Sequence, residues 1–188
     1  TGTDFVKETK KALSDLNVCA KKGLSETFDS TIGARSVYMP WGGRNQLTPA
    51  IAMAAKICGD ETDVCTVSAY GYSPYLMETS PFVGTIYSIV ASVSKVVATG
   101  ARYEDIRLTL QEFFERMTSD KKVWGVPASA LLGAVYAQIG LSLGAIGGKD
   151  SMSGTFEHIH VPPTLISFAL APANASRLIS NVLKGGEK

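Results

Sequence analysis

The sequence GGKDSMSG, at residues 147–154, places more polar chemistry in an apolar setting than any other stretch of the chain. A long apolar run, residues 128–146, precedes it, and the apolar segment TLISFALA, residues 164–171, follows it. The first run has the length of a buried helix and the second has the length of a strand. The sequence therefore predicts a turn with functional side chains between a buried helix and a buried strand.

The residues of this turn are those of an anion or phosphoester site. Gly147 and Gly148 allow a backbone to approach a ligand closely or to adopt positive φ, and Lys149 supplies a cation. Asp150 can bind Mg²⁺ or accept hydrogen bonds, and Ser151 adds a hydroxyl. The spacing differs from G-x-x-x-x-G-K-[ST], so the segment is not a P-loop. A tight Gly-rich turn with a surface Lys-Asp pair is the alternative interpretation.

The composition favours one soluble cytoplasmic domain over residues 1–188. The chain is 45% hydrophobic and 19% charged, and a domain of 188 residues buries about 70% of its unfolded surface without a metal or disulfide. The net charge of +1 provides no basic field for nucleic acid and no polybasic signal for a membrane. The three cysteines show neither disulfide nor zinc spacing. We find no signal peptide and no run of about 18 uninterrupted apolar residues.

Hydrophobic periodicity predicts the order of the secondary structure. The predicted helices are residues 4–16, 80–98, 127–139 and 176–183, with a helical turn at 50–56, and the predicted strands are 34–39, 62–69, 106–110 and 164–171.

Apolar spacing also predicts which face of each long helix belongs to the core. Ser80 and Pro81 are a typical helix start, and Gly100 ends that helix. The predicted core faces are Val83, Ile86, Tyr87, Val90, Val93 and Val97 in the first long helix, and Leu131, Leu132, Val135, Tyr136 and Ile139 in the second.

The predicted architecture is an α+β domain, in which helices pack on one face of a mixed sheet. The strand at 164–171 is apolar on both faces, so the other face of the sheet needs a partner. No nucleophilic triad can be assembled, and His158 and His160 are expected to be exposed in a hairpin-like segment. Arg35, beside Gly33, could clamp a phosphate or be an ordinary surface arginine.

Several separated motifs resemble phosphoribosylformylglycinamidine synthase (FGAM synthase), the large amidotransferase of purine biosynthesis. The strongest are GGKDSMS at 147–153 and VPPTLISFA at 161–169. Others are FDSTIGAR at 28–35, QLTPA at 46–50, LQEFFER at 110–116 and the segment 124–133. The resemblance implies that the chain is a fragment of a longer protein with two aminoimidazole-ribonucleotide-synthetase-like modules and a glutaminase domain. It is similar to the N-terminal subdomain of the second module.

The resemblance also implies an activity and a set of site residues. The whole enzyme converts formylglycinamide ribonucleotide, ATP and glutamine to the amidine, ADP, phosphate and glutamate, with Mg²⁺, whereas the fragment alone is expected to be inactive. The Gly147–Ser151 turn and Arg35 are expected to face a cleft with the sister module, which pairs through the sheet. Ala91 and Lys95 stand where relatives often place an acidic metal ligand and an asparagine.

Two main interpretations remain open. In the first, this domain supplies walls and charged groups to an active site of an ATP-dependent ligase. In the second, it is a non-catalytic half that pairs with the catalytic module and holds a structural nucleotide. A relative with kinase-like ATP chemistry, such as thiamine-phosphate kinase or selenophosphate synthetase, is a third alternative, but the GGKDSMS sequence favours the synthase. The fragment alone could also self-associate through its sheet.

Overall fold

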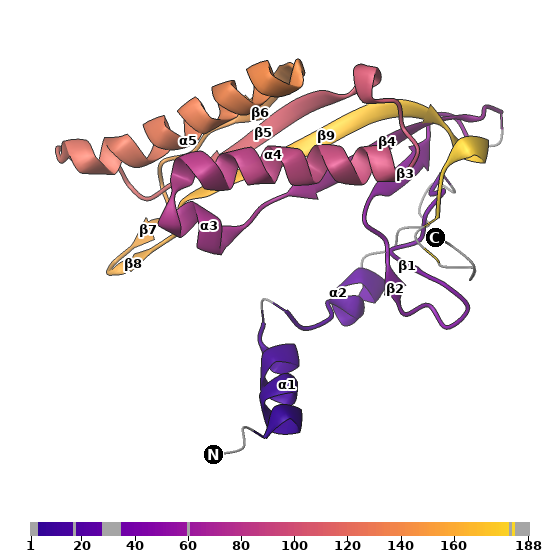
Figure 1. Cartoon of the computed structure of the whole chain (residues 1–188), viewed down its shortest axis with the longest axis horizontal. Helices are drawn as coiled ribbons and strands as arrows, with labels where there is room; N and C mark the ends of the chain where they lie inside the picture. Colours follow the sequence, from indigo (N-terminus) through magenta and orange to yellow (C-terminus); the bar gives the residue numbers. More distant parts are fainter. Residues whose placement is uncertain (1–3, 17, 28–34, 60, 181, 183–188) are drawn as a thin grey trace.

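The computed structural model describes residues 4–16, 18–27, 35–59, 61–180 and 182, and its centre is a sheet flanked by helices (Figure 1). Five strands form this sheet in the order β3-β4-β9-β5-β6. Neighbouring strands are antiparallel except β5 and β6, which run parallel because helix α5 connects them. The strands are β3 (Met53–Lys56), β4 (Val64–Gly71), β9 (Thr164–Asn174), β5 (Arg107–Phe113) and β6 (Ala145–Lys149).

Three helices cover one face of the sheet, which confirms the predicted α+β class with helices on one side of a mixed sheet. They are α3 (Pro74–Thr79), α4 (Pro81–Ala98) and α5 (Lys121–Leu141). Helix α4 lies over β4 and β9, and α5 packs against α4. The remaining elements are α1 (Phe5–Ser14), α2 (Lys22–Thr27), the ribbons β1 (Trp41–Gly42) with β2 (Thr48–Pro49) and β7 (Thr155–Phe156) with β8 (Ile159–His160), and the 3₁₀ turns η1 (Tyr103–Asp105) and η2 (Ala175–Arg177).

The core lies between the sheet and the helices. Strand β9 alternates, with Leu165 and Ala169 buried under the helices and Phe168 half-buried on the opposite side. Because β9 is apolar on both sides, it leaves an apolar, partly covered sheet face away from the helices, which we call the open sheet face. The largest fully buried side chains are Phe114, Met77, Ile89, Ile106, Leu108 and Leu165.

Helix α4 begins as predicted, because Ser80 accepts a hydrogen bond from the amide of Val83 and Pro81 fills the first helical position. Its predicted core face was right only in part: Val93 is buried and Ile86 packs against the core, whereas Tyr87 is 59% exposed and Val90 is 42% exposed. The small residues Ser88 and Ser92 also face the sheet, because they let the helix axis approach the strands closely. The buried residues are Gly84, Thr85, Ser88, Ile89, Ser92, Val93 and Val96.

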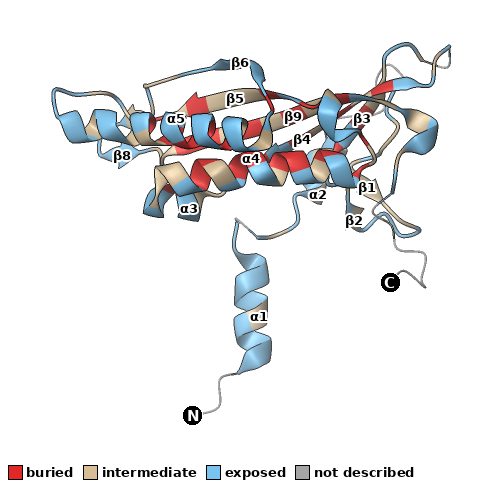
Figure 2. Ribbon diagram, turned by 45° about the horizontal axis from the view of Figure 1, so that its top comes forward, coloured by how far each residue is buried: buried red, intermediate tan, exposed pale blue. Residues whose placement is uncertain are grey.

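In helix α5 the predicted core face is reversed. It begins at Lys121 rather than near Pro127, because Asp120 accepts a hydrogen bond from the amide of Lys122. A Cβ added at Gly133 would lie 2.3 Å from the carbonyl oxygen of Phe82, so only glycine fits at this contact with α4. The buried residues are Pro127, Ala130, Gly133, Ala134 and Ala137, whereas the predicted core residues Leu131, Leu132, Val135, Tyr136 and Ile139 are exposed (Figure 2).

Other local predictions were also wrong or incomplete. Residues 53–56, predicted as a helical turn, form strand β3, because pairing with β4 outweighs the helix propensity of alanine. The amphipathic helix α1 exists, but none of its residues is buried and it stands away from the sheet. The predicted helix at 176–183 is a 3₁₀ turn at Ala175–Arg177, and residues 181 and 183–188 lie outside the described part. Residues 28–34, part of one motif, also lie outside it.

Helices α4 and α5 are both long and apolar enough to cross a membrane. The most apolar 18-residue windows of these helices are 39% and 28% buried within the fold. A core helix of a soluble protein passes the same test of length and composition, and both helices here pack on other elements of the fold. The sequence expectation had counted only uninterrupted apolar runs, which single residues such as Lys95 break.

Candidate functional site

The two glycines of the GGKDSMSG segment lie in a strand rather than in a turn. Gly147 pairs with Thr109 and Gly148 with Leu110, in the parallel β5–β6 ladder. A Cβ added at Gly148 would lie 2.3 Å from the carbonyl oxygen of Leu110, so this glycine permits close approach of β5. The predicted use of glycine for a tight turn was therefore wrong for these two positions.

Lys149 and Asp150 follow at the carboxyl ends of the two parallel strands. Lys149 pairs with Gln111, whose other neighbour is Ile166 on the open sheet face. Successive strand residues point to opposite faces, so Lys149 belongs to the open side and Asp150 to the helix side. Both residues are exposed, and no ion pair joins them among the residues that the structure describes. The two charges are thus presented in different directions, not as a surface pair.

The chain after Asp150 is held against the end of strand β5. The amide of Phe114 donates to the carbonyl oxygen of Ser151 at 2.9 Å, and the amide of Gly154 donates to the carbonyl oxygen of Phe114 at 2.9 Å. The hydroxyl oxygens of Ser151 and Ser153 lie 3.1 Å apart. These bonds order the segment and leave the ammonium of Lys149 available to a ligand.

Glu112 is a buried carboxyl group beside this segment that the sequence interpretation missed. It is 5% exposed, and its Oε2 has no hydrogen-bond partner within the described residues. Burial, and secondly the charge of Asp150, raise the pKa of Glu112 to about 7. Its register could have identified it, because alternation places Glu112 on the same buried face as Leu108 and Leu110.

We expect Glu112→Gln to remove a pH-dependent loss of stability. The native carboxyl keeps its proton up to a pH of about 7, whereas the unfolded one loses it near 4.5. The free energy of unfolding should therefore fall as the pH rises between these values, by up to about 3 kcal/mol, and stay level above them. Urea unfolding at pH 5 and pH 8 measures this fall, and exposed Glu104→Gln is the control. An unchanged pH dependence in Glu112→Gln would contradict the assignment.

Arg35 does not lie near Lys149 within this chain. The carbonyl oxygen of Arg35 accepts from the amide of Lys56, and Ser36 bridges Ala55, so Arg35 flanks the β3 edge. Lys149 lies on the opposite edge strand, β6. Five strand spacings of about 4.8 Å separate them by more than about 20 Å. Any shared role for Arg35 and Lys149 therefore requires a surface that spans the sheet.

Lys95 lies on α4 at a position where relatives were expected to place a metal ligand, and its ammonium group already has partners within the chain. Lys95 Nζ donates to the carbonyl oxygen of Tyr70 at 2.7 Å and lies 4.6 Å from the centroid of the Tyr70 ring. Burial lowers the pKa of Lys95. Ala91, one helical turn earlier, offers no oxygen. No group of three His, Cys, Asp or Glu residues in the described part could hold a metal, so α4 does not fit Mg²⁺.

The open sheet face carries an aromatic groove of about 560 Å³. Tyr38, Trp41, Tyr70 and Phe168 contribute to its lining, and Met53 lies at its edge strand. The indole Nε1 of Trp41 is buried without a hydrogen-bond partner among the described residues. A buried donor of this kind costs roughly 1–3 kcal/mol when it stays unpaired.

A second pocket, of about 410 Å³, lies near the end of β5 and the β7–β8 hairpin. Glu78, Glu115 and His160 are its polar lining residues, and valine, proline and methionine side chains supply much of the rest. His160 Nδ1 lies 2.9 Å from Glu115 Oε2, so the exposed histidine of the predicted hairpin has a specific partner.

Comparison with solved structures shows that the fold is similar to that of the PurL class of proteins. In particular, PurLQS from Thermotoga maritima matches 87% of this chain and 25% of its own chain, with a TM-score of 0.71 and 16% identity. T. maritima PurL complexed with FGAR matches 86% and 24%, with a TM-score of 0.66 and 20% identity. AaThiL complexed with AMPPCP and TMP matches 85% and 44%, with a TM-score of 0.51 and 13% identity.

The chain spans about a quarter of the length of the PurL chains that it matches. No family model matches the chain, and no curated protein sequence matches it. At these identities the likeness concerns the fold, and it confirms the expected synthase-like architecture.

Proposed function

We propose that this chain is part of an FGAM synthase, the ligase that converts formylglycinamide ribonucleotide, ATP and glutamine to formylglycinamidine ribonucleotide, ADP, phosphate and glutamate. The PurL fold supports this proposal, since a T. maritima PurL has been solved with FGAR and others with ATP or ADP. ATP would activate the amide oxygen of the ribonucleotide when it is bound. In this proposal the chain works in the cytoplasm and is inactive alone.

One observation carries the assignment of this chain's own residues. Lys149 and Asp150 lie where β5 and β6, the one parallel pair of this sheet, end. In open parallel sheets, ligands bind outside the carboxyl ends of the strands, and the same position is available here. We assign Lys149 to phosphate oxygens and Asp150 and Ser151 to polar groups of the substrate. Gly147 and Gly148 then serve by keeping β6 close to β5.

The partner in this proposal is a sister module that packs on the open sheet face, with a glutaminase domain supplying ammonia. The aromatic lining of the groove supports a protein partner there, because aromatic side chains are enriched at protein interfaces. Because Arg35 and Lys149 border opposite edges of this face, a module seated across it could contact both. The site would then be completed only by both modules.

A second candidate is a non-catalytic half that pairs with the catalytic module. The contacts of Lys95 favour it, because an ammonium group held by the Tyr70 carbonyl stands where a metal ligand would be needed. Under this alternative, the twin module performs all the chemistry and Lys149 is dispensable for the reaction.

Calorimetry of Mg-ADP binding tests whether the α4 of this chain still forms a working nucleotide site. We expect no measurable binding to the wild-type chain, because Ala91 and Lys95 provide no metal ligand. The double variant Ala91→Glu with Lys95→Asn should bind Mg-ADP, since it places two oxygen ligands one helical turn apart. Lys95→Met is the control that removes the cation alone. Tight binding by the wild type would show that this half keeps a working site.

A further inference from the structure

The outward surface of α4 and α5 is exposed (Figure 2), and its large exposed side chains are apolar. We call this surface the outer helix face. Its exposed fractions lie between 42% and 74%. The rings of Phe82 and Tyr136, 5.7 Å apart, connect the two helices at this surface. The residues that define it are Tyr87, Val90, Leu132, Val135, Tyr136 and Ile139.

The outer helix face lacks charge. No Asp, Glu, Lys or Arg occurs between Val123 and Gly148, and Lys95 is the one charged residue of α4. Large apolar side chains on a surface helix normally face inward, whereas α5 buries only proline, alanine and glycine, and α4 leaves Tyr87 and Val90 outside. Such a patch on a soluble domain indicates an interface.

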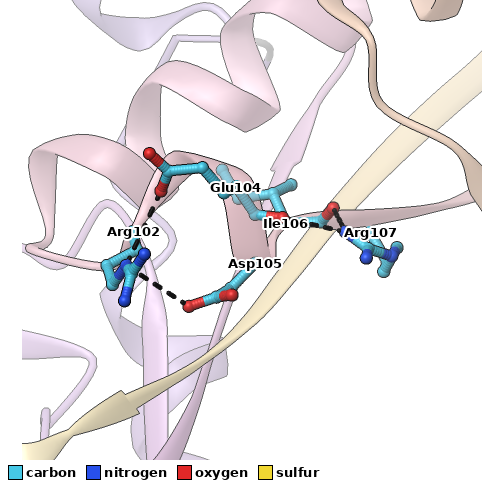
Figure 3. A network of polar contacts seen from close by, with 5 residues as sticks. All are labelled: Arg102, Glu104, Asp105, Ile106 and Arg107. Atoms are coloured by element: carbon cyan, nitrogen blue, oxygen red, sulfur yellow. Dashed lines mark hydrogen bonds and ion pairs between the residues drawn. The ribbon is translucent and has the colours of Figure 1, made fainter.

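Charged groups border both ends of this face. Lys121 and Lys122 begin α5, and at its other end Tyr103 donates a hydrogen bond to the carbonyl of Leu141. Beside Tyr103, the side chain of Arg102 lies 3.6 Å from Glu104 and 3.7 Å from Asp105 (Figure 3). An apolar centre with a polar rim is the usual arrangement of a protein interface.

We propose that the outer helix face is an interface between two copies of this chain, related by a twofold axis. A twofold contact places a patch against itself, so an uncharged patch is compatible with its own copy and a charged one is not. The six residues expose on the order of 500 Å², and with their flanking residues they approach the roughly 800 Å² per partner of a stable interface. The interface lies opposite the open sheet face, so it does not depend on the proposed sister module.

Sedimentation velocity of the chain over a wide concentration range tests this interface. We expect a monomer–dimer equilibrium, and Leu132→Glu should raise the dimer dissociation constant by about 100-fold or more, because the twofold axis buries the new charge twice. Leu132 is 64% exposed, so unchanged thermal unfolding should confirm that the variant folds. Ile159→Glu, at a 60% exposed residue of β8, should leave the equilibrium unchanged.

Three results would overturn the proposal. A wild-type chain that is monomeric at every concentration has no such interface. If Met53→Glu disrupts the dimer and Leu132→Glu does not, the two copies pair through the open sheet face instead. A third result would be a wild-type chain that forms no dimers in solution but binds phosphatidylcholine–phosphatidylglycerol vesicles. If Leu132→Glu abolished this binding, the outer helix face would bind a lipid surface.

Discussion

Replacing Gly71 by alanine should lower the free energy of unfolding by more than about 3 kcal/mol. The added Cβ would lie 2.0 Å from the carbonyl oxygen of Ser88 and 2.8 Å from the amide of Ser92, so helix α4 would have to move away from β4. Backbone atoms cannot rotate aside as side chains do, and the shift would loosen the layer that contains Ile89. Urea denaturation monitored by circular dichroism measures the loss.

Gly125→Ala is the matched control for Gly71→Ala. Gly125 lies inside α5 with no atom within 4 Å of an added Cβ. Alanine there should stabilise the chain by about 0.5–1 kcal/mol through helix propensity. If both variants changed stability by similar amounts, the close contact between α4 and β4 would be wrong.

Lys149→Ala in the complete synthase should lower kcat/KM by about 100-fold, or about 2.7 kcal/mol of transition-state stabilisation. The ammonium group lies at the carboxyl end of β6 on the open side of the sheet, free to reach phosphate oxygens. Steady-state assays with ATP and the ribonucleotide measure the effect. Its loss should not reduce stability, because the side chain is exposed.

Lys122→Ala is the control for this kinetic prediction, since Lys122 is also an exposed lysine but lies at the start of α5. We expect its kcat/KM to be unchanged. Wild-type rates in Lys149→Ala would favour the non-catalytic interpretation of this half.

Local signals predicted most elements of the fold. Ser80 and Pro81 started α4 as expected, and the alternation around Cys65 and Val67 predicted strand β4. Residues 53–56 were mistaken for a helical turn, because pairing with β4 is a long-range interaction that propensity does not contain. The core face of α5 was reversed and that of α4 was right only in part, because spacing shows that a face is apolar but not what it contacts.

The candidate site was predicted only in part. The sequence singled out Lys149 and Asp150, and the structure places them at the ends of parallel strands but toward opposite faces. It did not identify Glu112, whose pKa of about 7 results from burial and from Asp150, a residue 38 positions later. Arg35 was grouped with these residues, whereas the structure places it beside the far edge of the sheet.

The sequence by itself determined the α+β order of elements, the start of α4 and the polar segment after β6, because these depend on neighbours a few residues apart. Tertiary structure alone decided that Ser88 and Ser92 of α4 face the sheet and that Gly133 of α5 faces α4, while Tyr87 and Leu132 face outward. The physical reason is that two backbones approach closely only where side chains are small, and this depends on which strand or helix lies beside each helix.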